Sequence, residues 1–195
     1  DDTVYIGTYQ DNLLICAPDI PMQFFDDQKS AALATLYQRF PNAEICSIIL
    51  HSSVNLWGYS VHKNRQLIRV RAGNADQGTF KEWGEPLDEE QALLSTSIRN
   101  ERGERMYPYT AAADELLTED QVGEQFVFDV CKRYFGEALD QADGLLFETT
   151  LQGYSFTHSM TPKPLEKKQS KWLRYGLLFL IILIIQLLQR TVFKK

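Results

Sequence analysis

The feature that most constrains the fold is a series of β-rich segments between residues 43 and 83, separated by short turns. The segments cover residues 43–50, 54–62, 66–71 and 79–83, with turns at Ser52-Ser53 and Lys63-Asn64. Strands that follow one another through such short turns pair antiparallel. In the second segment Val54 and Asn55 begin two alternating rows of side chains, and neither row is plainly polar. We therefore expect an antiparallel sheet that is covered on both faces.

Helical spacing and turn residues on either side of this sheet complete the pattern. We expect a hairpin at 3–17, a loop at 19–25, a helix that begins at Asp27 and ends at Pro41, a helix after Asp88, a loop at 99–115, a helix from Thr118 to Gly136, and late strands at 145–151 and 154–156. The fold class is therefore α+β: a mainly antiparallel sheet packed by two or three helices, plus one C-terminal hydrophobic helix.

The last part of the chain differs sharply from the rest in charge and hydropathy. Residues 162–195 carry eight basic residues and one acidic residue, a net charge of +7, and the first 161 residues carry 12 basic and 25 acidic residues, a net charge of −13. Fifteen residues between Arg174 and Arg190 contain no charge. We divide the chain into a globular domain at 1–157, a basic Pro/Lys linker at 158–171 and a transmembrane helix at 172–193.

The apolar segment between the two arginines is about 22 Å long as a helix, shorter than the ~30 Å hydrocarbon core. Aromatic residues at both ends extend it, and the arginines can reach the headgroups. The residues expected to lie in the membrane are Trp172, Tyr175, Leu177, Leu178, Phe179, Leu180, Ile181, Ile182, Leu183, Ile184, Ile185, Leu187 and Leu188. The alternatives are a buried core helix and a helix buried between subunits of a soluble oligomer. A helix lying in the membrane plane is disfavoured, because the segment has no polar side.

The charge distribution also predicts location and partners. Five basic residues precede the apolar segment and three follow it, which favours a single-pass membrane protein with its body in the cytoplasm. Three cysteines without CxxC spacing agree with a reducing compartment. The acidic body disfavours nucleic acid. We expect membrane lipid as a partner through the C-terminal helix, and a protein partner of unidentified kind.

Few residues are candidates for chemistry. His51 and Ser52 form a polar cluster at a strand end, and with Glu85 they are the catalytic candidates, although each is also explained by turn or surface chemistry. Trp57, Tyr59 and Trp83 are the binding candidates, although aromatic strand residues are more often core.

Motifs for common cofactors are missing from the sequence. It has no HExxH, Walker loop, GxGxxG or EF-hand pattern, so we predict no metal and no cofactor. The pairing of the strands would place His51 and His62 about 26 Å apart, too far to share one metal ion. We favour a non-enzymatic recruitment or interaction module, with an enzyme of unknown reaction near His51 as the alternative.

Three segments carry a resemblance to known sequences. They are HSSVNLWGYSVHKNRQLIRVRAG at 51–73, GEPL at 84–87 and LQGYSF at 151–156. Together they resemble an uncharacterised bacterial protein family, a domain of unknown function, over residues 40–90 closely and 145–156 loosely. The resemblance implies a helix followed by a strand meander, and it implies no activity, cofactor or partner. The hydrophobic C-terminus departs from the simple soluble pattern of that group.

Overall fold

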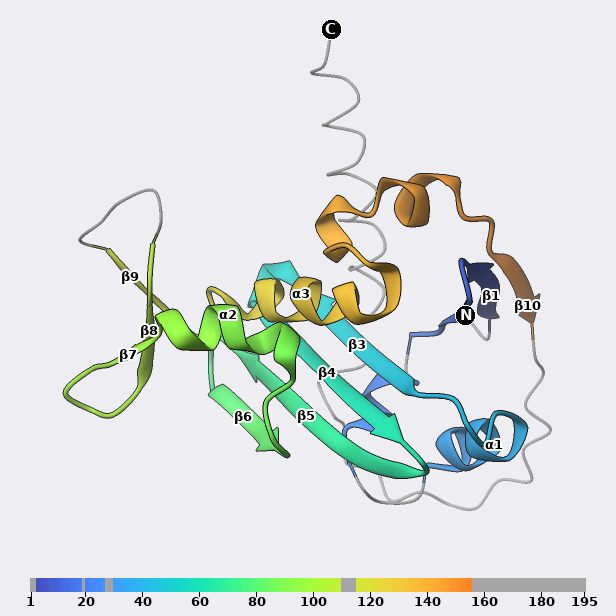
Figure 1. Cartoon of the computed structure of the whole chain (residues 1–195), viewed down its shortest axis with the longest axis horizontal. Coiled ribbons are helices and arrows are strands. Elements are labelled where there is room, and N and C mark those ends of the chain that lie inside the picture. Colours follow the sequence, from blue (N-terminus) through green and yellow to red (C-terminus); the bar gives the residue numbers. More distant parts are fainter. Residues whose placement is uncertain (1–2, 19, 27–29, 110–114, 156–195) are drawn as a thin grey trace, which may run out of the picture. The chain divides into compact units, whose positions relative to one another are not determined.

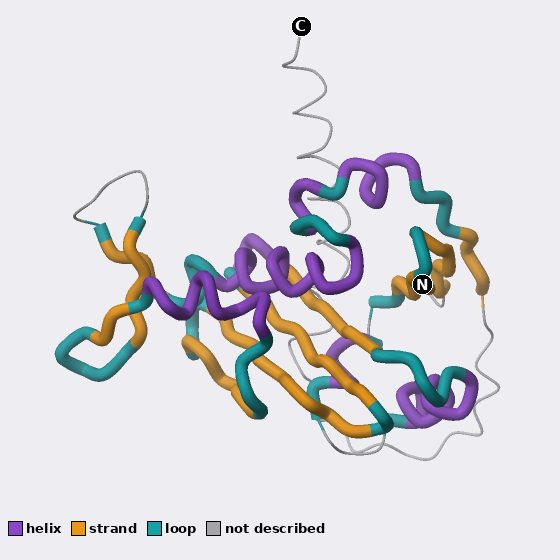
Figure 2. The backbone as a smooth tube through the Cα atoms, viewed as in Figure 1, coloured by secondary structure: helices purple, strands orange, loops and turns teal. Residues whose placement is uncertain are grey.

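The computed structural model describes residues 3–18, 20–26, 30–109 and 115–155. The described residues fall into two compact units, one within residues 20–149 and one formed by residues 3–18 with 150–155. The larger unit is built on a four-stranded antiparallel sheet in the order β3-β4-β5-β6 (Figures 1 and 2). Its strands are β3 (Ile45–His51), β4 (Leu56–Lys63), β5 (Gln66–Asn74) and β6 (Gly78–Trp83). The predicted meander is confirmed, because its strands pair in sequence order.

The turns of this sheet follow from local sequence. Asn64 and Arg65 join β4 to β5 with φ angles of 52° and 65°, the left-handed conformation of a tight two-residue hairpin. The connection from β3 to β4 is longer than a simple turn. It is a 3₁₀ turn, η2 (Ser52–Val54), which Asn55 ends with a φ of 46°.

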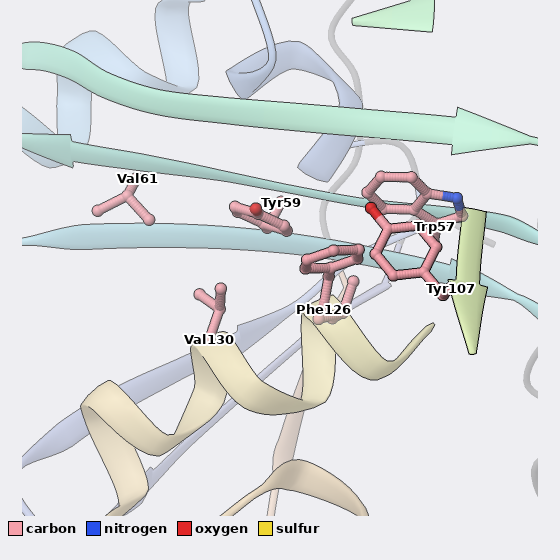
Figure 3. Close-up of a cluster of buried hydrophobic side chains, with 7 residues drawn as sticks. Trp57, Tyr59, Val61, Tyr107, Phe126 and Val130 are labelled. Carbon is pink, nitrogen blue, oxygen red and sulfur yellow. The ribbon is translucent and has the colours of Figure 1, made fainter. Parts of the chain in front are cut away.

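Both faces of the sheet are covered, as expected from its alternating rows. The helix α3 (Gly123–Phe135) lies across one face, where Phe126 stacks on Trp57 with ring centroids 5.9 Å apart (Figure 3). The hydrophobic cluster on this side is Trp57, Tyr59, Val61, Tyr107, Phe126, Val127 and Val130. The opposite face carries a second cluster, Phe25, Leu67, Val70 and Ala72. All residues of β4 except Lys63 are buried.

The helix ends were predicted better than the helix starts. Helix α1 (Ala31–Arg39) is capped by the hydroxyl of Ser30, which accepts the N–H of Leu33, and Asp27 lies outside the described residues. Helix α2 (Asp88–Thr96) begins after Leu87, whose N–H donates to the carboxylate of Glu90. Gly136 ends α3 with a φ of 77°, as predicted.

Three other expectations were wrong. The predicted loop at 99–115 contains strands of a small sheet in the order β7-β8-β9, formed by β7 (Ile98–Arg99), β8 (Arg105–Pro108) and β9 (Leu116–Thr118). Thr118 belongs to β9, and its N–H donates to Gln121 in a turn before α3. The predicted strand at 145–151 begins as the π-helix η4 (Gly144–Glu148). Two 3₁₀ turns complete the unit, η1 (Pro21–Phe24), inside the predicted loop at 19–25, and η3 (Leu139–Gln141).

The smaller unit contains a three-stranded antiparallel sheet in the order β10-β1-β2. Its strands are β1 (Thr3–Tyr9), β2 (Asn12–Cys16) and β10 (Gln152–Ser155). The predicted hairpin and the late strand at 154–156 are thus confirmed over the residues described. With its antiparallel sheets and helices, the protein has the predicted α+β class.

The predicted linker at 158–171 and transmembrane helix at 172–193 lie outside the described residues. Within the part of the chain that the structure describes, every helix is too short or too polar to span a bilayer.

Candidate functional site

The most unusual feature of the sheet is a pair of arginines on its helix-covered face. The strand register aligns Tyr59 of β4 with Arg71 of β5, and Arg71 with Glu82 of β6. Arg69 lies beside Val61 in the next row of the same face. Alternation along β5 therefore directs both guanidinium groups toward the space under α2 and α3, where charge has to be neutralised locally.

Arg69 is neutralised by Glu90 of α2. The Nε and Nη2 atoms of Arg69 donate to the two carboxylate oxygens of Glu90 at 2.9 and 2.7 Å, and Nη1 donates to the carbonyl of Gly84 at 2.8 Å. Both side chains are at most 1% exposed. Burial lowers the pKa of Arg69, but the hydrogen bonds and charge of Glu90 outweigh it and raise this pKa further above its ordinary value.

Arg71 is fully buried and is neutralised mainly by Glu119, which follows β9. Its Nη2 atom donates to Glu119, and its guanidinium carbon lies 4.1 Å from the centre of the Phe126 ring. Glu119 also accepts hydrogen bonds from Thr79 and, at 3.0 Å, from Tyr107. Burial raises the pKa of Tyr107 to about 12, which keeps its hydroxyl protonated as a donor at neutral pH.

Arg105 of β8 closes the cluster from the small sheet. Its Nη1 atom lies 3.3 Å from Glu82 and 3.8 Å from Glu119. We call this cluster the Arg–Glu network; its members are Arg69, Arg71, Arg105, Glu82, Glu90 and Glu119. Three positive and three negative charges cancel, and they join β5, β6, α2, β8 and the start of the segment before α3. Such a network favours one arrangement of these elements, because displacing α2 or the segment after β9 would separate the buried Arg69 or Arg71 from its main carboxylate partner.

A cleft of about 460 Å³ opens beside the network. Its lining includes the network members Glu82, Arg105 and Glu119, and three further charged residues, Arg99, Glu104 and Asp120. Among the described residues neither Glu104 nor Asp120 forms an ion pair. Glu104 accepts a hydrogen bond from Asn100 at 2.8 Å and Asp120 accepts one from Asn55 at 3.2 Å. The lining of the cleft therefore holds four acidic side chains, Glu82, Glu104, Glu119 and Asp120, against two basic ones, Arg99 and Arg105.

The predicted catalytic candidates are not gathered in this cleft. His51 is buried at the end of β3, and Ser52 is exposed in the following turn, where its hydroxyl donates to Glu124 of α3 at 2.6 Å. Glu85 follows β6, whose last residue, Trp83, pairs with Val70 in the row of Ser47, four residues along β3 from His51. An enzyme site near His51 stays an alternative prediction.

The binding candidates are likewise separated. Trp57 and Tyr59 are fully buried in the cluster of Figure 3, and Trp83 is 54% exposed at the end of β6. The first two therefore act as core side chains and do not line a groove. Within the described residues, no group of three His, Cys, Asp or Glu side chains is placed to hold a metal ion.

Sequence reasoning missed the Arg–Glu network, although one signal for it was present. Arg69 and Arg71 alternate with apolar residues in a strand that we expected to be covered on both faces. Two arginines on a covered face require buried carboxylates. The spacing does not say which carboxylates these are, because Glu90 and Glu119 lie 21 and 48 residues away from their partners.

Comparisons with known proteins agree with the resemblance over the central strands. No curated protein and no solved structure matches the chain. One family model matches residues 1–119, a segment that contains β1 to β9 and all six residues of the Arg–Glu network. Since this match covers more than half of the sequence, the chain belongs to the family of unknown function DUF6928.

Proposed function

We propose that this protein is an interaction domain held at a membrane by its C-terminal segment, and that the cleft recognises a basic side chain of a partner protein. The observation that carries the recognition step is the excess of acidic groups in the lining of the cleft. Four acidic side chains line it against two basic ones, and two of the acidic ones, Glu104 and Asp120, form no ion pair among the described residues. A lysine or arginine would supply the missing charge.

The charge of the body supports this choice of partner. The first 161 residues carry a net charge of −13, so the domain attracts basic partners and repels acidic ones over distances of about a Debye length. The network contributes rigidity, since its buried ion pairs hold both walls of the cleft in one arrangement. A preformed cleft loses less conformational entropy on binding.

The membrane location rests on the sequence of the tail. The segment from Trp172 to Phe193 is 22 residues long, is apolar on every side at its centre and follows a basic linker. The larger number of basic residues on its N-terminal side favours a cytoplasmic body. A reduced environment suits the three cysteines, which form no disulfide among the residues described.

Membrane attachment is tested by replacing both Ile182 and Ile185 with Lys in the full chain. Each lysine at the centre of a spanning helix costs about 2.5 to 3.5 kcal/mol, so the variant is expected in the soluble fraction after carbonate washing. The matched control replaces the same two residues with Leu and is expected to stay with the membrane. Unchanged fractionation of the lysine variant contradicts the proposed attachment.

Recognition is tested with the detergent-solubilised full chain and three Gly/Ser decapeptides that carry one central Arg, Lys or Glu. We expect binding in the order Arg or Lys over Glu, and we expect Glu104→Lys to weaken it at least tenfold. Glu101→Lys is the matched control, since it changes charge equally on the same loop but does not line the cleft. Equal affinity for the Glu peptide, or equal loss in both variants, contradicts the proposed recognition.

A further inference from the structure

The sheet of the smaller unit has an unusual composition for this acidic protein. Strands β1, β2 and β10 contain no Asp, Glu, Lys or Arg. None of the described residues of this unit, 3–18 and 150–155, is buried. Leu13 is 45% exposed and Tyr154 is 49% exposed. A three-stranded sheet needs one covered hydrophobic face to be stable in water, so its coverage requires an explanation.

The register separates this sheet into two different faces. On one face Tyr5 lies over Gly153, and Leu151 lies over Gly7, where an added Cβ would be 2.7 Å from the leucine side chain. The chain therefore partly covers that face with its own side chains. The other face, which we call the apolar face, carries Val4, Ile6, Leu13, Ile15 and Tyr154.

We propose that the apolar face of β1, β2 and β10 rests on the membrane, in the interfacial region of the bilayer. This inference rests on the proposed membrane attachment. Strand β10 ends at Ser155, and 16 residues separate it from Trp172, the first residue of the proposed anchor. Extended chain of that length spans at most about 55 Å, so the anchor confines this sheet to the neighbourhood of the lipid surface.

The chemistry of the face fits lipid better than water or a charged partner. Aliphatic side chains and a tyrosine, with Thr8 and Gln152 at its margins, match the mixture of apolar and uncharged polar groups found at the membrane interface. An acidic body with a net charge of −13 is repelled by anionic headgroups, but strands without charge are not. The four lysines at 163–171 add attraction to anionic lipid close to this sheet in sequence.

The test compares fluorophores on the two faces of β2 in the full chain, reconstituted in liposomes of phosphatidylcholine and phosphatidylglycerol. An environment-sensitive probe is attached to Leu13→Cys in a Cys16→Ser background for the apolar face, and to native Cys16 for the opposite face. Burial raises the pKa of all three native cysteines, that of Cys131 to about 12, but only Cys16 is exposed, so Cys46 and Cys131 react more slowly with the probe.

We expect the probe at position 13 to shift to shorter wavelength on reconstitution and to be quenched at least twofold by headgroup-region spin-labelled lipid. The probe at position 16 should respond less. No shift at position 13, or equal quenching at both positions, overturns the proposal. A shift without lipid quenching also overturns it, and indicates coverage by protein, either a second copy or the tail.

The same preparations separate this inference from the proposed attachment. The variant with Ile182→Lys and Ile185→Lys reports on the anchor through carbonate washing alone. If the unmodified chain stays on the membrane after carbonate washing while the probe at position 13 is not quenched, the anchor is supported and the proposed contact of the sheet with lipid is refuted. If carbonate releases the unmodified chain, the attachment itself fails.

Discussion

The two main sheets of this protein differ in how far their residues are buried and in whether they carry charge. The β3–β6 sheet is covered on both faces by its own chain and encloses charged groups in the Arg–Glu network. The β10-β1-β2 sheet has no charged residue in its strands and no buried residue among those described. Charge is therefore found where the chain pairs it, and is missing from the strands of the sheet in which none of the described residues is buried.

This difference has a physical reason. A charged group is tolerated inside a protein when its partner is held at hydrogen-bonding distance, as Glu90 is held by the start of α2 beside Arg69. The β10-β1-β2 sheet, none of whose described residues is buried, offers no position where a charge and its partner could be buried together. If it rests on lipid, as we propose, an unpaired charge on it would lower its affinity for the interface, so uncharged residues are the ones that fit.

The largest effect should follow from breaking the Arg–Glu network. Replacing Glu90 with Gln keeps its shape but leaves the buried Arg69 with the partly exposed Glu82 as its only carboxylate partner among the described residues. We expect a loss of about 3 to 5 kcal/mol in the free energy of unfolding of the larger unit, measured by urea denaturation with circular dichroism. The control Asp88→Asn, on the exposed first turn of the same helix, should cost under about 1 kcal/mol. Equal losses in the two variants would show that the network does not stabilise this sheet.

The second largest effect should come from adding a methyl group, which should cost more stability in the larger unit than in the β10-β1-β2 sheet. A Cβ added at Gly123 would lie 2.0 to 2.2 Å from ring atoms of Trp57, which is fully buried and cannot turn away. We expect Gly123→Ala to destabilise the larger unit by about 1 to 3 kcal/mol in urea.

The matched variant in the β10-β1-β2 sheet is Gly153→Ala, where the added Cβ would lie 3.2 Å from the edge of the exposed Tyr5 ring. That ring can move, so the change should stay under about 1 kcal/mol. A larger cost at Gly153 than at Gly123 would contradict the view that the first sheet is the more tightly packed.

The smallest effect concerns pH. The hydrogen bond from Arg133 holds the pKa of Glu44 below its ordinary value of 4.5, and Tyr134 and Lys63 act in the same direction against the effect of burial. A lowered folded-state pKa gives stability that is complete above pH 4.5 and is lost as pH falls through the lower value. We expect a contribution of under about 1 kcal/mol for this partly exposed pair at the surface.

The pH effect is measured as the urea midpoint between pH 6 and pH 3. The Glu44→Gln variant should show a shallower fall than the unmodified chain. Amide hydrogen exchange in β1 and β2, corrected for the intrinsic effect of pH, should change less over this range because those strands carry no titratable carboxylate. A fall that is equally steep in Glu44→Gln would assign the acid sensitivity to other carboxylates.

Much of the fold was predictable because it is local. The hairpin from β4 to β5 follows from Asn64, and the end of α3 follows from Gly136, since both depend on the left-handed backbone conformation that these residues favour. The small sheet β7-β8-β9 was missed because its strands are two to four residues long and lie between charged and Gly-containing segments. Short strands carry too few residues for alternation to show.

The sequence alone determined the order of the strands in the central meander, the coverage of both its faces and the separation of an acidic body from a basic, apolar tail. Each of these depends on residues close to one another along the chain. Only the tertiary structure decided which carboxylates neutralise Arg69 and Arg71, and that Glu104 and Asp120 border one cleft. Those pairings join segments tens of residues apart, and their energies depend on distances that only the folded chain creates.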